Sequence, residues 1–165
     1  PLSGLSVGQA MFVEGYGMVE AGGGVAAKVS PFGLPTPLGD FLGMPLPNYR
    51  FKVVDDDGSD VRVGQVGELW VKGPGVLEGY HGDAAATAAV KTEDGWLRTG
   101  DLVRRGMFGL VSFAGRSKDV IKKGGYSVYA VEVQAALEQH PSVAEAAVLG
   151  IPDERLGEQV VAAVR

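Results

Sequence analysis

The sequence contains no cysteine among its 165 residues. A disulfide framework, a cysteine nucleophile and a zinc site with cysteine ligands are therefore excluded. Histidine is scarce, because only His81 and His140 occur, and their separation does not match the spacing of metal ligands. No apolar run approaches the roughly 20 residues of a membrane helix, and the opening stretch PLSGLSVGQA lacks the pattern of a secretory signal. We therefore expect a cytoplasmic protein without a transmembrane segment.

Basic charge is sparse outside one segment. The chain has 15 Lys and Arg against 20 Asp and Glu, which gives a formal net charge of −5. Seven of the basic residues lie between Arg98 and Lys123, where the only acidic residues are Asp101 and Asp119. A surface for nucleic acid needs basic charge across a whole face. The segment instead favours a small phosphorylated ligand, and no nucleic-acid partner is expected.

Glycine and proline are abundant, with 26 and 9 residues. Their density over residues 21–48 predicts a long loop or a series of turns. Alternating apolar residues over 49–53 predict a strand, which an Asp-Gly turn at 57–58 folds into a hairpin. GELWVKG, residues 67–73, predicts a further strand. The first hundred residues are therefore expected to be rich in β structure.

The remaining segments alternate between helical and extended patterns. Asp83 is expected to cap a helix in an alanine-rich run that Gly95 closes. Residues 109–115 predict a strand, 129–140 a helix that Pro141 stops, and 142–152 a strand. The last three elements predict a small α/β unit at the end of the chain.

Five sequence blocks occur in the order found in one enzyme superfamily. They are GYGMVE (15–20), GELWVKGPGVLEGY (67–80), GWLRTGD (95–101), GRSKDVIKKGG (115–125) and HPSVAEAAVLGIPDERLGE (140–158). With these blocks the chain resembles the adenylate-forming enzymes, which comprise acyl-CoA synthetases, adenylation domains of peptide synthetases, and luciferases. It is most similar to ligases that act on fatty acids or other acyl groups.

The resemblance implies a mixed α+β fold in two domains. Residues 1–115 would form the β-rich end of a large N-terminal AMP-binding domain, with a distorted barrel and sheet. Residues 116–119 would form a hinge. Residues 120–165 would begin a small, mobile α/β C-terminal domain, which is truncated here.

The resemblance also implies a reaction in two steps. A carboxylate, such as a fatty acid, attacks the α-phosphate of ATP and gives an acyl adenylate and pyrophosphate. A thiol, from CoA or from the pantetheine arm of a carrier protein, then displaces AMP. ATP, Mg²⁺ and CoA are the expected cofactors, and the enzyme's main task is to neutralise charge as it develops.

The resemblance assigns roles to individual residues. Tyr16 would lie against the adenine, and Glu20 would bind magnesium and act in catalysis. Asp101 would bind the ribose hydroxyls, a task that suits an acceptor-only carboxylate. Arg116 would reach the ribose and phosphates with its planar fork of donors. The neighbours of Tyr16 that complete the nucleotide-binding motif are Gly17, Met18 and Val19.

Two further assignments concern the second half of the chain. Lys118 occupies the hinge position, whose backbone torsions would change as the small domain turns. Gly124 and Gly125 match a loop that lines the CoA passage. Taken without the ordered blocks, Lys118 is equally typical of an exposed lysine and the glycine pair of a plain turn. By the same criterion Asp101, which follows Thr-Gly, is typical of a turn residue.

Some family features are absent from the sequence. Val19 stands where the family usually has threonine, so it cannot donate a hydrogen bond to a phosphate. No phosphate loop of the SGTTGxPKG kind occurs, nor the late Gly-Lys motif whose lysine supports adenylation. We therefore expect a partial chain that is inactive by itself. Two alternatives to an acyl-CoA ligase are an acyl-AMP ligase or peptide-synthetase adenylation domain that loads a carrier protein, and a degenerate, non-catalytic module that binds nucleotide or a partner.

Overall fold

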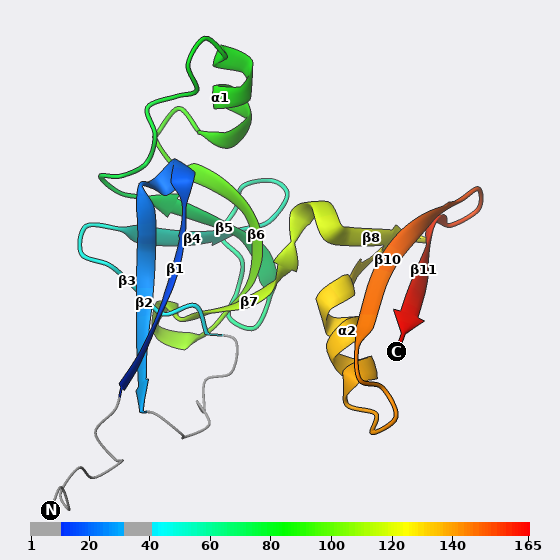
Figure 1. The fold of residues 1–165 in the computed structure, drawn as a ribbon. Helices are drawn as coiled ribbons and strands as arrows, with labels where there is room; N and C mark the ends of the chain where they lie inside the picture. Colours follow the sequence, from blue (N-terminus) through cyan, green and yellow to red (C-terminus); the bar gives the residue numbers. More distant parts are fainter. Residues whose placement is uncertain (1–10, 32–40) are drawn as a thin grey trace, which may run out of the picture.

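The computed structural model describes residues 11–31 and 41–165, which form two lobes (Figure 1). The first lobe contains strands β1 to β7 and helix α1, and the second contains β8 to β11 and helix α2. The 3-10 turn η4 (Ser117–Asp119) joins them. The division into domains at residues 116–119 stays a prediction.

The first sheet has the order β1-β2-β3 and consists of β1 (Met11–Met18), β2 (Gly23–Pro31) and β3 (Met44–Pro45). The prediction of a loop or turns from residue 21 onward is wrong for β2. The 3-10 turn η2 (Val19–Ala21) reverses the chain, and β2 then pairs antiparallel with β1. Burial of Val25 and Ala26 favours the strand over the weak strand propensity of its small residues. Residues 32–40 of the predicted loop lie outside the described residues.

The second sheet is an antiparallel meander of β4 (Arg50–Val54), β5 (Val66–Lys72), β6 (Leu97–Arg105) and β7 (Val111–Arg116). The predicted turn at Asp57-Gly58 is confirmed, since Gly58 has a φ of 79°. The Asp55 carboxylate accepts hydrogen bonds from the backbone N–H groups of Asp57 and Ser59. The strand predicted in GELWVKG is confirmed as β5, whose alternate residues are buried.

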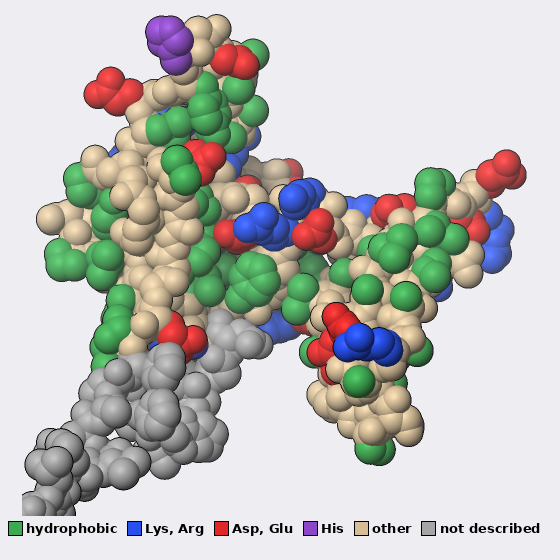
Figure 2. Space-filling view, in the orientation of Figure 1, with side chains coloured by type: hydrophobic (Ala, Val, Ile, Leu, Met, Phe, Trp, Pro, Cys, Tyr) green, Lys and Arg blue, Asp and Glu red, His purple; other side chains and the backbone are tan. Residues whose placement is uncertain are grey.

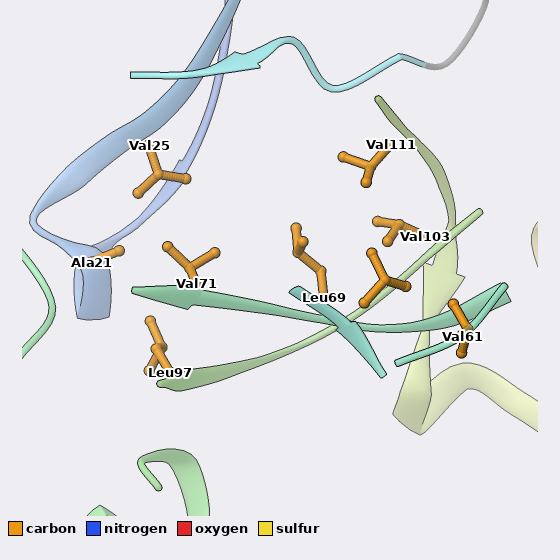
Figure 3. Packing of buried hydrophobic residues seen from close by; sticks show 9 residues of the cluster. Ala21, Val25, Val61, Leu69, Val71, Leu97, Val103 and Val111 are labelled. Atoms are coloured by element: carbon orange, nitrogen blue, oxygen red, sulfur yellow. The ribbon is translucent and has the colours of Figure 1, made fainter. Parts of the chain in front are cut away.

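The core of the first lobe lies between these two sheets (Figure 3). Leu69 and Val71 of β5, Leu97 of β6 and Val25 of β2 are almost inaccessible to solvent. Full burial of such a side chain contributes about 1.5 to 3 kcal/mol. The remaining members of the cluster are Ala21, Val53, Val61, Val103 and Val111. The packing supports β1 and β6, which carry several of the predicted site residues.

Helix α1 (Ala84–Val90) begins at the predicted cap, because the Asp83 carboxylate accepts a hydrogen bond from the Ala86 N–H at 2.8 Å. The helix ends before Gly95, contrary to the prediction. Residues 92–95 form a separate turn in which the Gly95 N–H donates to the Thr92 carbonyl at 2.9 Å. The Thr92 hydroxyl binds the backbone N–H and carbonyl of Trp96, and this competition with helical hydrogen bonds explains why the helix ends early.

The second lobe is a four-stranded antiparallel sheet with one helix. Its elements are β8 (Val120–Lys123), β9 (Tyr126–Tyr129), α2 (Ala130–Glu138), β10 (Ala146–Asp153) and β11 (Gly157–Val164), in the sheet order β10-β11-β8-β9. The predicted helix and the strand that follows it are confirmed as α2 and β10. The hairpin of β8 and β9 and the strand β11 were not predicted.

The two lobes also meet away from η4. Arg104 of β6 forms a salt bridge with Glu132 of α2, at 2.9 Å between Nη2 and Oε1. Figure 2 shows basic and acidic side chains close together where the lobes join. The mixed, sheet-rich fold class is confirmed, and in the described part of the chain the sheets stay open and form no closed barrel. No helix in residues 11–31 and 41–165 is long and apolar enough to cross a membrane.

Candidate functional site

Asp101 lies in a bulge of β6. The register of β5 and β6 shifts there, so that the three residues 99–101 of β6 lie opposite a single residue of β5, Leu69. The Thr99 hydroxyl donates to the Leu69 carbonyl at 2.6 Å and accepts from the Asp101 N–H at 3.1 Å. Gly100 has a φ of 72°, which glycine adopts without steric cost. The turn expected from the Thr-Gly-Asp sequence is therefore an interruption inside a continuing strand.

Three elements of the first lobe meet at the Asp101 carboxylate. Its side chain is 5% exposed, although it carries a charge. The Tyr16 hydroxyl, from β1, donates to Oδ2 at 2.6 Å. The Arg116 guanidinium, from the end of β7, places Nε 3.2 Å from Oδ1. Buried carboxylates are stable only when they are paired and hydrogen-bonded, and both conditions hold here.

The protonation of Tyr16 follows from this environment. Burial raises the pKa of the Tyr16 phenol, and the hydrogen bond and the negative charge of Asp101 raise it further. The nearby Thr99 hydroxyl and the Arg116 charge act in the opposite direction but are weaker. The pKa lies well above the ordinary value of about 10. The phenol therefore remains a hydrogen-bond donor to Asp101 at neutral pH.

Glu20 lies in η2, directly after β1, and is partly exposed. Its Oε1 accepts a hydrogen bond from the Tyr80 hydroxyl at 3.1 Å. That bond, together with desolvation and the Glu20 charge, raises the pKa of Tyr80. The carbonyl of Glu20 accepts from the Leu77 N–H at 2.8 Å, which ties η2 to the segment before α1. Nothing in the spacing of the sequence could have indicated the contact with Tyr80, 60 residues away.

One cleft of about 330 Å³ brings together half of the predicted site residues. Its lining includes Met18, Glu20, Asp101, Arg116 and Lys118. Tyr80 and Arg98, which the sequence did not indicate as site residues, line it as well. The cleft thus holds two carboxylates and three cationic side chains, and Lys118 of the segment that joins the lobes is one of these cations.

The other residues of the GYGMVE motif lie beside the cleft. Tyr16, Gly17 and Val19 line an adjacent open hollow. A Cβ atom at Gly17 would lie 2.0 Å from the Gly23 carbonyl oxygen, so only glycine fits where β1 and β2 come together. Val19 is 91% exposed, so its side chain is free of packing constraints.

Of the candidates in the second half of the chain, Lys118 lines the cleft with Asp101, whereas Gly124 and Gly125 do not. Lys118 is exposed in η4. Gly124 and Gly125 form a two-residue turn between β8 and β9, with φ values of 55° and 86°. Two successive positive φ values are typical of a type I′ hairpin turn. The plain-turn interpretation therefore explains the glycine pair without a ligand, and a role in a CoA passage stays a prediction.

A magnesium ion fits this donor set only in part. Within the two described ranges no three acidic or histidine side chains cluster as metal ligands. Glu20 is a partly exposed carboxylate on the cleft and could supply one oxygen ligand. Mg²⁺ commonly takes one or two carboxylates and completes its shell with phosphates and waters. The site therefore suits a metal that arrives with a phosphorylated ligand.

Comparison with known protein families gives two matches. The model of the AMP-binding enzyme family matches residues 5–81, and the model of the AMP-binding enzyme C-terminal domain matches residues 132–165. Together they account for more than half of the chain.

Curated relatives are named as CoA ligases. A long-chain-fatty-acid–CoA ligase of Yersinia pestis is 40% identical over 148 residues, which are 90% of this chain and 26% of the relative. An indoleacetate–CoA ligase of Aromatoleum aromaticum is 41% identical over 140 residues, 85% of this chain and 27% of the relative. The chain thus spans about a quarter of the length of these relatives.

Solved structures show the same arrangement of elements. The crystal structure of ATP-bound MatB from Rhodopseudomonas palustris matches with a TM-score of 0.81 and 33% identity, over 92% of this chain and 30% of that one. The apo structure of the same protein matches with a TM-score of 0.67. On the agreement of family models, relatives and structures, the chain belongs to the family of AMP-binding, adenylate-forming enzymes.

Proposed function

We propose that this chain carries the nucleotide-binding residues of an acyl-CoA ligase. The observation that supports the proposal most is that Tyr16 and Arg116 both bind the Asp101 carboxylate, which lines a cleft together with Arg116 and Glu20. The names of the relatives support a carboxylic acid and CoA as the further substrates. The reaction would join them through an acyl adenylate, with release of pyrophosphate and then AMP.

Asp101 is proposed to bind the ribose of the nucleotide. Each carboxylate oxygen has two lone-pair directions. Tyr16 occupies one lone-pair direction of Oδ2, and Arg116 occupies one of Oδ1. Each oxygen can therefore accept a further hydrogen bond from a ribose hydroxyl. Because the side chain is already fixed by two partners, little side-chain entropy would be lost on binding.

Arg116 is proposed to serve both the ribose and the phosphates. Only its Nε pairs with Asp101 at 3.2 Å, and its side chain is 57% exposed. Its terminal nitrogens can therefore reach a phosphorylated ligand in the cleft. A guanidinium stays charged at every relevant pH, which suits the stabilisation of phosphate charge.

Glu20 is proposed to be the protein's carboxylate ligand for Mg²⁺. When bound, the ion would neutralise phosphate charge during attack by the substrate carboxylate. The Tyr80 hydroxyl holds Oε1 of Glu20 and leaves Oε2 without a protein hydrogen bond among the described contacts. Oε2 is thus the oxygen that a metal could approach without displacing Tyr80.

Lys118 is proposed to lie at the pivot between the lobes. The two MatB structures share one fold, yet the ATP-bound one matches this chain with a TM-score of 0.81 and the apo one with 0.67. A difference of this size between two states of one protein supports a movement of parts, with η4 as the exposed connection here. The proposed movement would exchange the adenylation pose for the pose that accepts CoA, or the pantetheine arm of a carrier protein.

The activity is proposed for a longer protein of which this chain would be a part. The chain covers 26% of the Yersinia pestis ligase, and its sequence contains neither the phosphate loop nor the late Gly-Lys motif. The chain by itself is therefore proposed to be inactive. The location in the cytoplasm stays a prediction.

The proposal is tested in the full-length protein by ATP–pyrophosphate exchange with a panel of carboxylic acids. Asp101→Ala removes the ribose acceptors, and each lost charge-assisted hydrogen bond contributes about 1.5 to 3 kcal/mol. We expect the KM for ATP to rise at least about tenfold. Asp56→Ala, at an exposed position of the β4–β5 turn, is the control and should leave KM unchanged. Exchange that fails with every acid would favour a non-catalytic module, and an unchanged KM in Asp101→Ala would remove the role of Asp101.

A further inference from the structure

We propose that Glu68 is a positioning residue that holds the β6 bulge in the shape that presents Asp101 to the nucleotide. This inference rests on the proposed function. Glu68 does not line the 330 Å³ cleft in which Asp101 and Arg116 lie. It acts through the backbone of the bulge and not by touching the ligand.

The bulge leaves backbone groups without partners in the strand ladder. Residues 99–101 face Leu69 alone, so the regular β5–β6 hydrogen bonds cannot serve all of them. Side chains supply the missing partners. Thr99 accepts from the Asp101 N–H, and Glu68 accepts from the Gly100 N–H through Oε1 at 3.0 Å. Glu68 therefore completes the hydrogen bonding of the residue directly before Asp101.

The second oxygen of Glu68 is also fixed. Oε2 accepts a hydrogen bond from the indole N–H of Trp70 at 2.8 Å. The Trp70 ring is flanked by two cations from neighbouring strands, with Lys52 Nζ and the Arg98 Cζ each 5.4 Å from the ring centroid. Register places Lys52, Trp70 and Arg98 directly opposite one another across β4, β5 and β6. One carboxylate oxygen of Glu68 is thus bound to Trp70, which lies between two cations, and the other is bound to the bulge.

Loss of the anchor would act on the carboxylate that binds the ribose. Gly100 keeps a φ of 72°, a conformation that glycine exchanges easily for others when no partner holds its N–H. Asp101 is the next residue, and its two oxygens must meet Tyr16 and Arg116 at the same time. Displacement of these oxygens would misplace the acceptors that the ribose hydroxyls require. The geometry of the bulge therefore controls the affinity for the nucleotide.

The test measures AMP binding to the full-length protein by calorimetry. Glu68→Ala should weaken binding about tenfold. Glu68→Gln keeps an oxygen that can accept from Gly100 but cannot also accept from the indole, so it should weaken binding about threefold or less. In the double variant with Asp101→Ala, the removal of Glu68 should have no further effect, because it acts through Asp101. Glu93→Ala, which removes an exposed carboxylate in the turn of residues 92–95, is the matched control.

A second measurement is independent of ligand. Hydrogen exchange of the peptide that covers β6 should become faster at Gly100 in Glu68→Ala and in Trp70→Phe, which removes the indole donor but keeps an aromatic ring. If Glu68→Ala does not fold, Trp70→Phe and Glu68→Gln decide the question with the same two readouts. Unchanged exchange, or an effect of Glu68→Ala that adds in full to that of Asp101→Ala, would overturn the proposal. If Asp101→Ala leaves AMP binding intact while exchange responds as expected, the proposed function fails and the support of the bulge stands.

Discussion

Replacement of Tyr16 by phenylalanine tests the network around Asp101 with the smallest possible change. Tyr16→Phe removes one hydroxyl and keeps the ring that packs against the core. The hydroxyl donates to Asp101 Oδ2 at 2.6 Å, and the Asp101 side chain is 5% exposed, so water has little access to replace it. A hydrogen bond to a charged group contributes about 1.5 to 3 kcal/mol, and its removal leaves the buried Oδ2 without this donor. We expect the free energy of unfolding to fall by about 2 kcal/mol.

The loss of stability in Tyr16→Phe is also expected to depend on pH. In the folded protein the pKa of Tyr16 is raised above its value of about 10 in an unfolded chain. The stability that comes from this raised pKa is present below pH 10 and is lost as the pH rises above it, since the unfolded chain then releases its proton first. Phenylalanine does not titrate. The difference in stability between the original protein and Tyr16→Phe should therefore be constant from pH 7 to 9 and should shrink above pH 10.

The assay is urea unfolding of the full-length protein, followed by tryptophan fluorescence at several pH values. Tyr126→Phe is the matched control, because Tyr126 is 78% exposed and its loss of a hydroxyl should change the midpoint little. A loss below about 0.5 kcal/mol in Tyr16→Phe would show that the bond to Asp101 does not stabilise the fold. A difference that stays constant up to pH 11 would show that Tyr16 does not titrate as the structure implies.

Three further predictions concern the edges of the site. Tyr80→Phe removes the hydroxyl that donates to Glu20 Oε1. The Mg²⁺ concentration that gives half-maximal ATP–pyrophosphate exchange should therefore fall or stay equal. A clear rise in that concentration would show that Tyr80 helps to bind the metal. Lys118→Pro restricts the backbone of the connection between the lobes. Rapid-quench measurements should therefore show a greater loss in the rate of thioester formation than in the rate of adenylation. Equal losses in the two rates would contradict a pivot at this residue. Gly124→Ala and Gly125→Ala each force a residue with a Cβ into positive φ, at a cost of about 1 to 2 kcal/mol, and an unchanged thermal midpoint in both would contradict the observed turn.

Local chemistry made several elements predictable. The Asp-Gly pair indicated the turn at Gly58, and the cap at Asp83 indicated where α1 begins. The alternation in GELWVKG indicated β5, because one face of that strand packs into the core. In each case the residues that form the sequence pattern lie within a few positions of the residues whose conformation the pattern predicts.

Other features depend on distant contacts and could not be predicted in this way. The strand β2 is rich in glycine and alanine, which have weak strand propensity. It forms because it pairs with β1 and buries Val25 and Ala26 in the core. The Thr-Gly pair before Asp101 indicates a turn but cannot show that the strand continues beyond it. The resemblance named Tyr16 and Asp101 separately, whereas the bond between them joins residues 85 apart in the chain. Tyr80 and Glu68 lie in the block of residues 67–80, but nothing in the sequence indicated their contacts with Glu20 and Gly100.

The position of Arg116 has a thermodynamic consequence. Arg116 is the last residue of β7 and also the cap of η4, so the side chain that pairs with Asp101 and the backbone that leads to the second lobe belong to one residue. A rotation about the N–Cα bond of Arg116 therefore moves the side chain that pairs with Asp101 and the chain that leads to the second lobe together. By linkage, a ligand that prefers one arrangement of this pair must favour the matching orientation of the lobes, and the orientation must change the affinity for the ligand by the same factor.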